Sequence, residues 1–160
     1  MYHDREEERE STIKTLKHLV EICKQGEEGF ETAAENIRNT EYESLLRNYS
    51  QQRAKFASEL ESEIVKLGGD RDDNTFKGML DDAGGALHRG WINIKSAVAG
   101  GDSEAILAEC QTGDKAAVET YEKALQTSNL PANIESLVRR QYADVVEAYN
   151  KIKTFKHVAS

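Results

Sequence analysis

The apolar residues of this chain recur at alternating steps of three and four positions along nearly its whole length. This spacing predicts amphipathic helices, because it places the apolar side chains on one face of each helix. We expect four long helices, at about residues 9–39, 41–67, 103–127 and 131–156, and a shorter one at about 86–99. No segment alternates apolar and polar residues with the period of two that strands require. The sequence therefore predicts an all-α protein.

Local signals mark the ends of these helices. Thr40 followed by Glu43 is typical of a capping box that opens a helix. The double glycines at 68–69 and 100–101 indicate helix ends, since glycine adopts the left-handed conformation that closes a helix. Asp102 is placed to cap the helix that follows it.

The lengths of the connections predict how the helices are arranged. Short connections join the first two and the last two long helices, so each pair forms an antiparallel hairpin. A long crossover with its own short helix joins the two hairpins. This is the connectivity of a ferritin-like, up-down four-helix bundle. A chain of 160 residues has the length of one domain, so we expect residues 1–160 to form a single domain.

A polar residue interrupts each long apolar stripe near its midpoint. These residues are Glu27, Gln52 with Arg53, Asp114 and Gln141. The midpoints of matched antiparallel hairpins lie at the same height, so we expect one polar layer across the core. Unpaired polar groups at that depth are costly, so the layer must satisfy itself, hold water or hold a metal.

Two orientations of Arg53 remain open. In the first, Arg53 points inward and binds Glu27 and Asp114 bidentately, where di-iron relatives hold cations. In the second, Arg53 points outward and Gln52 alone completes the layer.

A metal centre is the alternative to a self-satisfied layer. Ferritin-like di-iron proteins combine carboxylates with two Glu-x-x-His motifs. The carboxylate candidates are Glu27, Glu28, Glu59, Glu63, Glu109 and Asp114. However, none of His18, His88 and His157 has a glutamate three positions before it. We therefore favour no metal cofactor, with iron or manganese as the alternative.

The stretch ALHRGWINIK at 86–95 concentrates His88, Arg89 and the only tryptophan, Trp91. We expect it to pack on the bundle as a crossover anchor, with His88 and Arg89 satisfying carboxylates or carbonyls on the long helices. A ligand or proton-transfer role for His88 is the alternative. Close approach of the Trp91 ring would explain the glycines at 26 and 29 inside the first helix. The apolar face of the crossover helix comprises Leu87, Trp91, Ile94 and Val98.

Composition narrows the classes of partner and location. With 29 acidic against 21 basic side chains, the net charge of −8 argues against general nucleic-acid binding. No apolar run has the length of a membrane span or of a signal peptide, which predicts a cytoplasmic protein without a membrane partner. Cys23 and Cys110 are far apart in sequence and are expected to be reduced core residues.

Several stretches resemble an uncharacterised bacterial family of ferritin-like four-helix-bundle proteins, a domain of unknown function found in or near stress-response proteins. The stretches are LVEICKQGEEGFETAAENI, QQRAKFASELESEI, LHRGWINIKSA, ILAECQTGDKAAVETYEKAL and RRQYADVVEAY. The resemblance implies a ferritin-like fold and an association with stress, but no established activity. Relatives more often carry glutamate at the positions of Gln111 and Asp114 and histidine at that of Tyr149, which implies a weakened metal site in this chain.

These observations favour a non-catalytic binding or structural protein whose partner is unknown. The alternative is a di-iron or di-manganese carboxylate oxidoreductase or metal-binding protein. The long amphipathic helices leave a third hypothesis open, that of an oligomerising scaffold built from copies of this chain.

Overall fold

The structure is a computed structural model that describes residues 2–70, 88–127 and 129–159, with the backbone alone at 2–4, 88, 89 and 156–159. Within these ranges the chain forms helices and short connections and no strand, in agreement with the all-α prediction. The helices are α1 (Tyr2–Asn36), α2 (Thr40–Lys66), the 3₁₀-helix η1 (His88–Trp91), α4 (Ile94–Gly100), α5 (Ser103–Thr127) and α6 (Ala132–Ala159).

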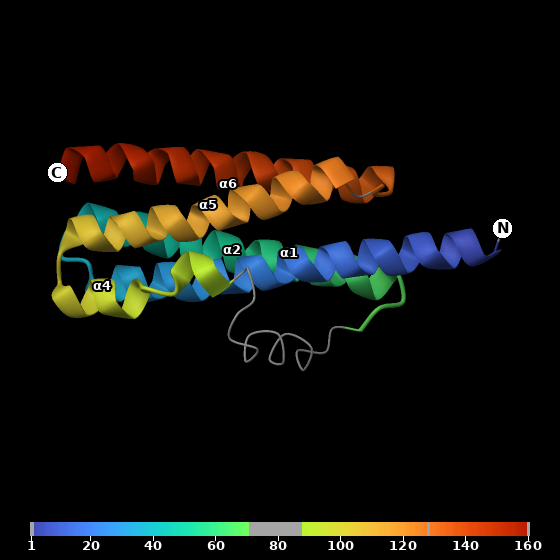
Figure 1. Cartoon of the computed structure of the whole chain (residues 1–160), viewed down its shortest axis with the longest axis horizontal. Helices are drawn as coiled ribbons and strands as arrows, with labels where there is room; N and C mark the ends of the chain where they lie inside the picture. Colours follow the sequence, from blue (N-terminus) through green and yellow to red (C-terminus); the bar gives the residue numbers. More distant parts are fainter. Residues whose placement is uncertain (1, 71–87, 128, 160) are drawn as a thin grey trace.

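The long helices are arranged as two antiparallel hairpins, α1 with α2 and α5 with α6, which lie side by side (Figure 1). The two hairpins meet mainly between α1 and α5, whereas α2 and α6 approach each other at few points. Both η1 and α4 pack against α1 and α5. The N-terminal turns of α1 extend beyond the ends of the other helices (Figure 1).

The hydrophobic core consists of two clusters. The first lies around Leu19, Cys23 and Leu60, and the second lies around Phe30 and Leu46. Along α2 the first cluster begins at Phe56 and the second ends at Tyr49, and along α5 they meet between Ala117 and Cys110. Arg53 and Asp114 therefore occupy the level that separates the two apolar clusters.

Several helix ends agree with their sequence signals. Gly68 and Gly101 follow α2 and α4 with φ of 87° and 69°, a conformation that side chains disfavour. The Asp102 carboxylate accepts a hydrogen bond from the Glu104 backbone N–H at 3.1 Å, as a capping residue does.

Other helix ends differ from the prediction. The first helix begins before residue 9 and ends at Asn36. The cap of α2 is Asn39, whose side chain accepts from the backbone N–H groups of Glu41 and Tyr42, while Thr40 is already helical. The prediction of a capping box that begins at Thr40 is therefore wrong, because the capping residue is Asn39, one position earlier.

The crossover helix predicted at 86–99 is not continuous. A turn at Ile92–Asn93 separates η1 from α4, and residues 86 and 87 lie outside the described part. Gly90 and Asn93 are both poor helix formers in an interior position, which explains the break. The backbone of Gly90 also lies directly against Gly113 of α5, where a continuous helix with side chains would not fit.

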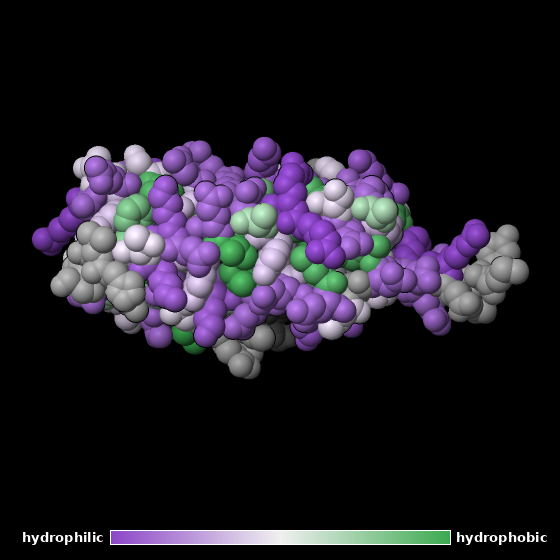
Figure 2. Space-filling view, turned by 90° about the horizontal axis from the view of Figure 1, so that it is seen from above, coloured by the Kyte–Doolittle hydropathy of each residue, from purple (hydrophilic) through white to green (hydrophobic). Residues whose placement is uncertain are grey.

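Figure 2 shows the face of the molecule that lies at the top in Figure 1. This face is predominantly hydrophilic, and its apolar patches are small and separate. The large apolar side chains that are most exposed among the described residues are Val65 and Ile92. Isolated exposed apolar residues are ordinary on a protein surface. No described helix has the length and apolar character needed to cross a membrane.

Candidate functional site

A buried ion pair joins the two hairpins at mid-height. Arg53 Nη1 of α2 lies 2.5 Å from Asp114 Oδ1 of α5, and the two side chains are 1% and 0% exposed. Arg53 shares the inner face of α2 with Tyr49 and Phe56, four residues before it and three after it. The inward orientation of Arg53 is therefore the one that the fold adopts.

The rest of the guanidinium is also enclosed. Its Nε donates to Gln52 Oε1 at 3.2 Å, and its Cζ lies 5.2 Å from the centroid of the Phe30 ring. Such a cation–π contact is stabilising when the cation is desolvated. Gly26 of α1 gives the side chain its room, since a Cβ there would lie 3.3 Å from Arg53 Cγ. Three helices thus form the Arg53 site.

Burial and charge act in opposite directions on this pair. Burial raises the pKa of Asp114, and the Arg53 guanidinium opposes that rise. Burial by itself lowers the pKa of Arg53, but the contact with Asp114 outweighs burial and the pKa is raised. Arg53 therefore remains a cation, and Asp114 is its counterion.

A second polar group lies next to the ion pair and involves α6. Tyr121 donates its hydroxyl proton to Gln141 Oε1 at 2.7 Å. Gln141 Nε2 in turn donates to the Phe56 carbonyl and to Glu59 Oε1, at 3.3 and 3.1 Å. Gln141 is therefore buried with its amide satisfied on both sides, but its partners are Tyr121 and α2, not the Arg53–Asp114 pair.

This second group runs from the core to the surface. Cys23 Sγ lies 3.1 Å from the Tyr121 hydroxyl, which already donates to Gln141, so the thiol is the donor in this contact. At the other end, Arg140 donates to Glu59 Oε2 at 3.1 Å from an exposed position. The connected chain includes side chains from all four long helices.

Neither cysteine is poised for nucleophilic chemistry. Burial raises the pKa of Cys23 to about 11 and raises the pKa of Cys110 further. A thiol that stays protonated at neutral pH is a weak nucleophile and a poor metal ligand. Both are free, buried thiols, as their separation in the sequence suggests.

Glu27 lies outside the buried layer, contrary to the sequence-based prediction. Its side chain is only half-buried, and the Glu27 backbone carbonyl accepts a hydrogen bond from Ser50 Oγ at 2.8 Å. The inward position on this turn of α1 belongs to Gly26, which the Arg53 side chain covers. Arg53 consequently contacts Asp114 through one nitrogen and does not bridge two carboxylates.

The carboxylates proposed as metal ligands are dispersed. Glu28 is exposed, Glu63 pairs with Lys66, and Glu109 is half-buried. Glu59 bonds to Gln141, and Asp114 pairs with Arg53. Across the described ranges, no three histidine, cysteine, aspartate or glutamate side chains form a group that could hold a metal ion. These residues do not fit the donor set of a di-iron or di-manganese centre.

Trp91 anchors η1 between the hairpins. Its indole lies against Gly29 of α1 and Gly113 of α5, and a Cβ at either glycine would overlap the ring. The ring meets Phe30 edge-on, with centroids 5.0 Å apart and planes at 74°. Phe30 therefore contacts both Trp91 and Arg53. The side chains of His88 and Arg89 and all of Leu87 lie outside the described part, whereas Ile94 is buried and Val98 packs on the core.

Cys23, Tyr121 and Gly113 complete these contacts but are absent from the predicted layer and anchor. Gly29 lies against the Trp91 ring as predicted, whereas the prediction for Gly26 is wrong, because Arg53 and not Trp91 lies against it. Apolar spacing assigns Cys23 and Tyr121 to the core stripes without regard to the polar atoms at their tips. A glycine inside a long helix indicates that a bulky group packs against that position. Gly113 lies inside a predicted helix just as Gly29 does, so the same reasoning applies to it.

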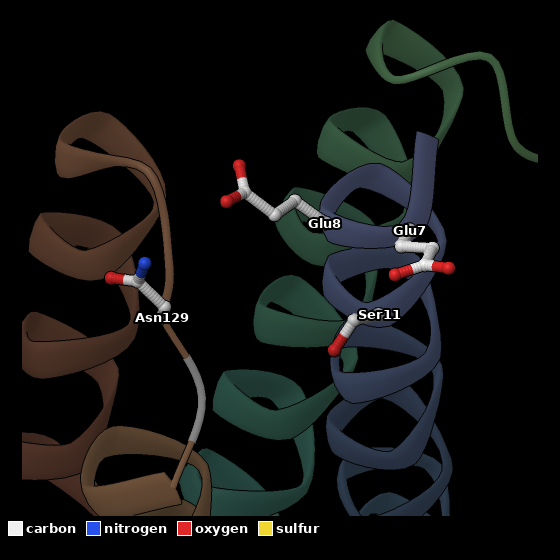
Figure 3. A pocket seen from close by; sticks show the side chains of 4 residues that line it. All are labelled: Glu7, Glu8, Ser11 and Asn129. Carbon is white, nitrogen blue, oxygen red and sulfur yellow. The ribbon is translucent and has the colours of Figure 1, made fainter. Parts of the chain in front are cut away.

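A recess of about 320 Å³ lies near the N-terminal end of α1, lined by Glu7, Glu8, Ser11 and Asn129 (Figure 3). All four side chains are exposed, and Glu8 and Asn129 lie across the gap from each other. The charged side chains that line this recess are therefore hydrated. The buried charged groups of the protein described above are Arg53 and Asp114.

A family model described as a domain of unknown function (DUF2383) matches residues 11–127. No curated protein matches the chain. The matched region ends at the last residue of α5. It contains the Arg53–Asp114 pair and Trp91, whereas α6 with Gln141 lies outside it.

Proposed function

The chain belongs to the family of this domain of unknown function (DUF2383), and we propose that it is a ferritin-like helical bundle that acts as a non-catalytic binding or structural protein. In this proposal the Arg53–Asp114 pair stands where ferritin-like di-iron proteins hold metal ions. The observation that carries the proposal is an arginine that is 1% exposed in mid-core and paired with a carboxylate of the opposite hairpin.

The connectivity of the long helices supports the ferritin-like part of the proposal. Two antiparallel hairpins that a long segment of the chain joins are what a ferritin-like topology requires. Arg53 lies on the second long helix and Asp114 on the third, between the two apolar clusters. Metal ligands in such bundles also project into the middle of the core from facing helices.

The charge of Arg53 supports the metal-free part. A guanidinium is cationic at every physiological pH and presents only donors, so it cannot ligate a metal and repels one. It also engages Asp114, which the alternative di-metal hypothesis requires as a ligand. The packed surroundings of Arg53, with Gly26 and Phe30 against it, support a permanent structural role.

Metal analysis tests the proposal against its alternative. Protein purified without chelator is incubated with Fe²⁺ or Mn²⁺ under anaerobic conditions, desalted and analysed by mass spectrometry for metals. We expect no stoichiometric metal in the wild type. Binding of two metals per chain that is lost in Asp114→Asn, but kept in the surface control Glu43→Gln, would overturn the proposal and establish the di-metal alternative.

The wider assignments stay predictions. A cytoplasmic location and the absence of nucleic-acid and membrane partners rest on composition, and the association with stress rests on resemblance. The net charge of −8 favours a partner that is not a polyanion. The homo-oligomer hypothesis is tested by light scattering over a range of protein concentrations.

A further inference from the structure

The Arg53–Asp114 contact uses only one nitrogen and one oxygen of the two groups. Arg53 Nη2 and Asp114 Oδ2 are buried and have no hydrogen-bond partner among the described residues. Gln52 already takes the proton on Nε, and Phe30 lies over the guanidinium face. Nη2 and Oδ2 are therefore buried with their hydrogen-bonding capacity unused.

Such atoms are rare in folded proteins. A buried donor or acceptor left unsatisfied loses its interactions with water and gains nothing in return, and the cost is greater for a charged group. Most buried polar atoms are paired with protein or with ordered water, and a buried water makes about three hydrogen bonds. Arg53 Nη2 and Asp114 Oδ2 belong to groups that are in direct contact through Nη1 and Oδ1, so both orphaned atoms lie at the same buried contact. One water spans up to about 5.5 Å between two partners.

We propose that one buried water molecule bridges Arg53 Nη2 and Asp114 Oδ2 in the middle of the bundle. The occupant must accept a hydrogen bond from the nitrogen and donate one to the oxygen, and water does both. The guanidinium would repel a metal ion, and the carboxylate would repel an anion. The pair of charges therefore favours a small neutral molecule. This site does not depend on the proposed function.

Counting internal waters tests the proposal in solution. Oxygen-17 relaxation dispersion of the solvent reports water molecules that stay inside a protein for long times. We expect one fewer such water in the double variant Arg53→Met/Asp114→Leu than in the wild type. Val138→Ala, which removes apolar volume but keeps the pair, is the control and should match the wild type. An equal count in the wild type and the double variant would refute the bridging water.

A high-resolution crystal structure of the wild type gives a second test that requires no variant to fold. The expected result is one solvent peak within hydrogen-bond distance of both Nη2 and Oδ2. A two-point contact between the groups with no solvent peak contradicts the proposal. So does a peak with the anomalous signal or ligand distances of a metal ion.

Discussion

Gly113 of α5 and Trp91 of η1 are complementary in shape, since the indole fills the space that any side chain at position 113 would need. The same ring fills the space beside Gly29 of α1. These glycines belong to different hairpins, so a single aromatic ring holds the end of the crossover against both. The absence of side chains at Gly29 and Gly113 leaves the space that the Trp91 ring occupies.

Replacing Gly113 with alanine should therefore destabilise the protein, although alanine is the better helix former. The new Cβ would overlap the indole, and overpacking of this kind costs about 1–3 kcal/mol. Urea unfolding followed by circular dichroism measures the loss. Fluorescence of Trp91, the only tryptophan, should show whether the ring has moved. The control is Gly100→Ala, because a Cβ there would meet nothing within 4 Å. Equal stability of Gly113→Ala and the wild type would contradict this account.

The two members of the buried ion pair should depend strongly on each other. Arg53→Met leaves the Asp114 carboxylate buried without a counterion, and breaking such a pair costs about 3–5 kcal/mol. The double variant Arg53→Met/Asp114→Leu removes both charges and should be more stable than Arg53→Met alone. A double-mutant cycle from urea unfolding measures the coupling.

Arg47→Met is the matched surface control for this cycle. Arg47 and Glu43 form an exposed i,i+4 pair at 3.3 Å, and such pairs contribute about 0.3–0.5 kcal/mol. If the effects of the Arg53 and Asp114 substitutions simply add, the two groups do not stabilise each other and the expectation fails.

Removing the Tyr121 hydroxyl should destabilise the protein more than removing a comparable hydroxyl near the surface. Tyr121→Phe leaves Gln141 Oε1 and the Cys23 thiol without their partner in the core, at a cost of about 1–3 kcal/mol. The comparison is Tyr142→Phe, whose hydroxyl bonds to Glu122 at 3.0 Å in a half-buried position. Similar free energies of unfolding for the two variants would show that the Tyr121 contacts contribute little.

Stability should fall in alkaline solution, and the direction follows from the buried thiol and phenol. Burial raises the pKa of Cys23 to about 11 and the pKa of Tyr121 well above 10. The unfolded chain loses these protons from about pH 8.5 for the thiol and about pH 10 for the phenol. The folded chain still holds them there, so it binds more protons and its stability falls as pH rises. Below about pH 8 this contribution is fully present.

Urea unfolding between pH 8 and about pH 11 measures this dependence, and each such group contributes a slope of about 1.4 kcal/mol per pH unit. Cys23→Ala should flatten part of the decline that begins first, because Cys110, whose pKa burial also raises, contributes to it with the same sign. Tyr121→Phe should flatten the later part. A decline that is unchanged in both variants would assign the alkaline instability to other groups.

The sequence predicts the long helices well because their apolar spacing is continuous. The helix expected at 103–127 coincides with α5, where Asp102 supplies the cap and the spacing of three and four residues continues through Asp114. The crossover is harder, because Gly90 and Asn93 interrupt its pattern and contact with Gly113 decides the local winding.

The middle of the core could be predicted only in part. Gln52 and Arg53 are neighbours on a helix, about 100° apart, so spacing alone could not decide which one points inward. The decision depends on Asp114, which lies on the other hairpin. On α1 the inward position is Gly26, and a stripe traced through side chains passes over a glycine to the next residue, Glu27.

The buried ion pair also has a consequence for how the protein unfolds. Its cation comes from the α1–α2 hairpin and its anion from the α5–α6 hairpin, so separating the hairpins breaks the pair and exposes an apolar face on each half to water. Neither half is then a favourable partly folded species. We expect the two hairpins to open together in one cooperative transition, with their slowest backbone amides exchanging hydrogen at the same limiting free energy.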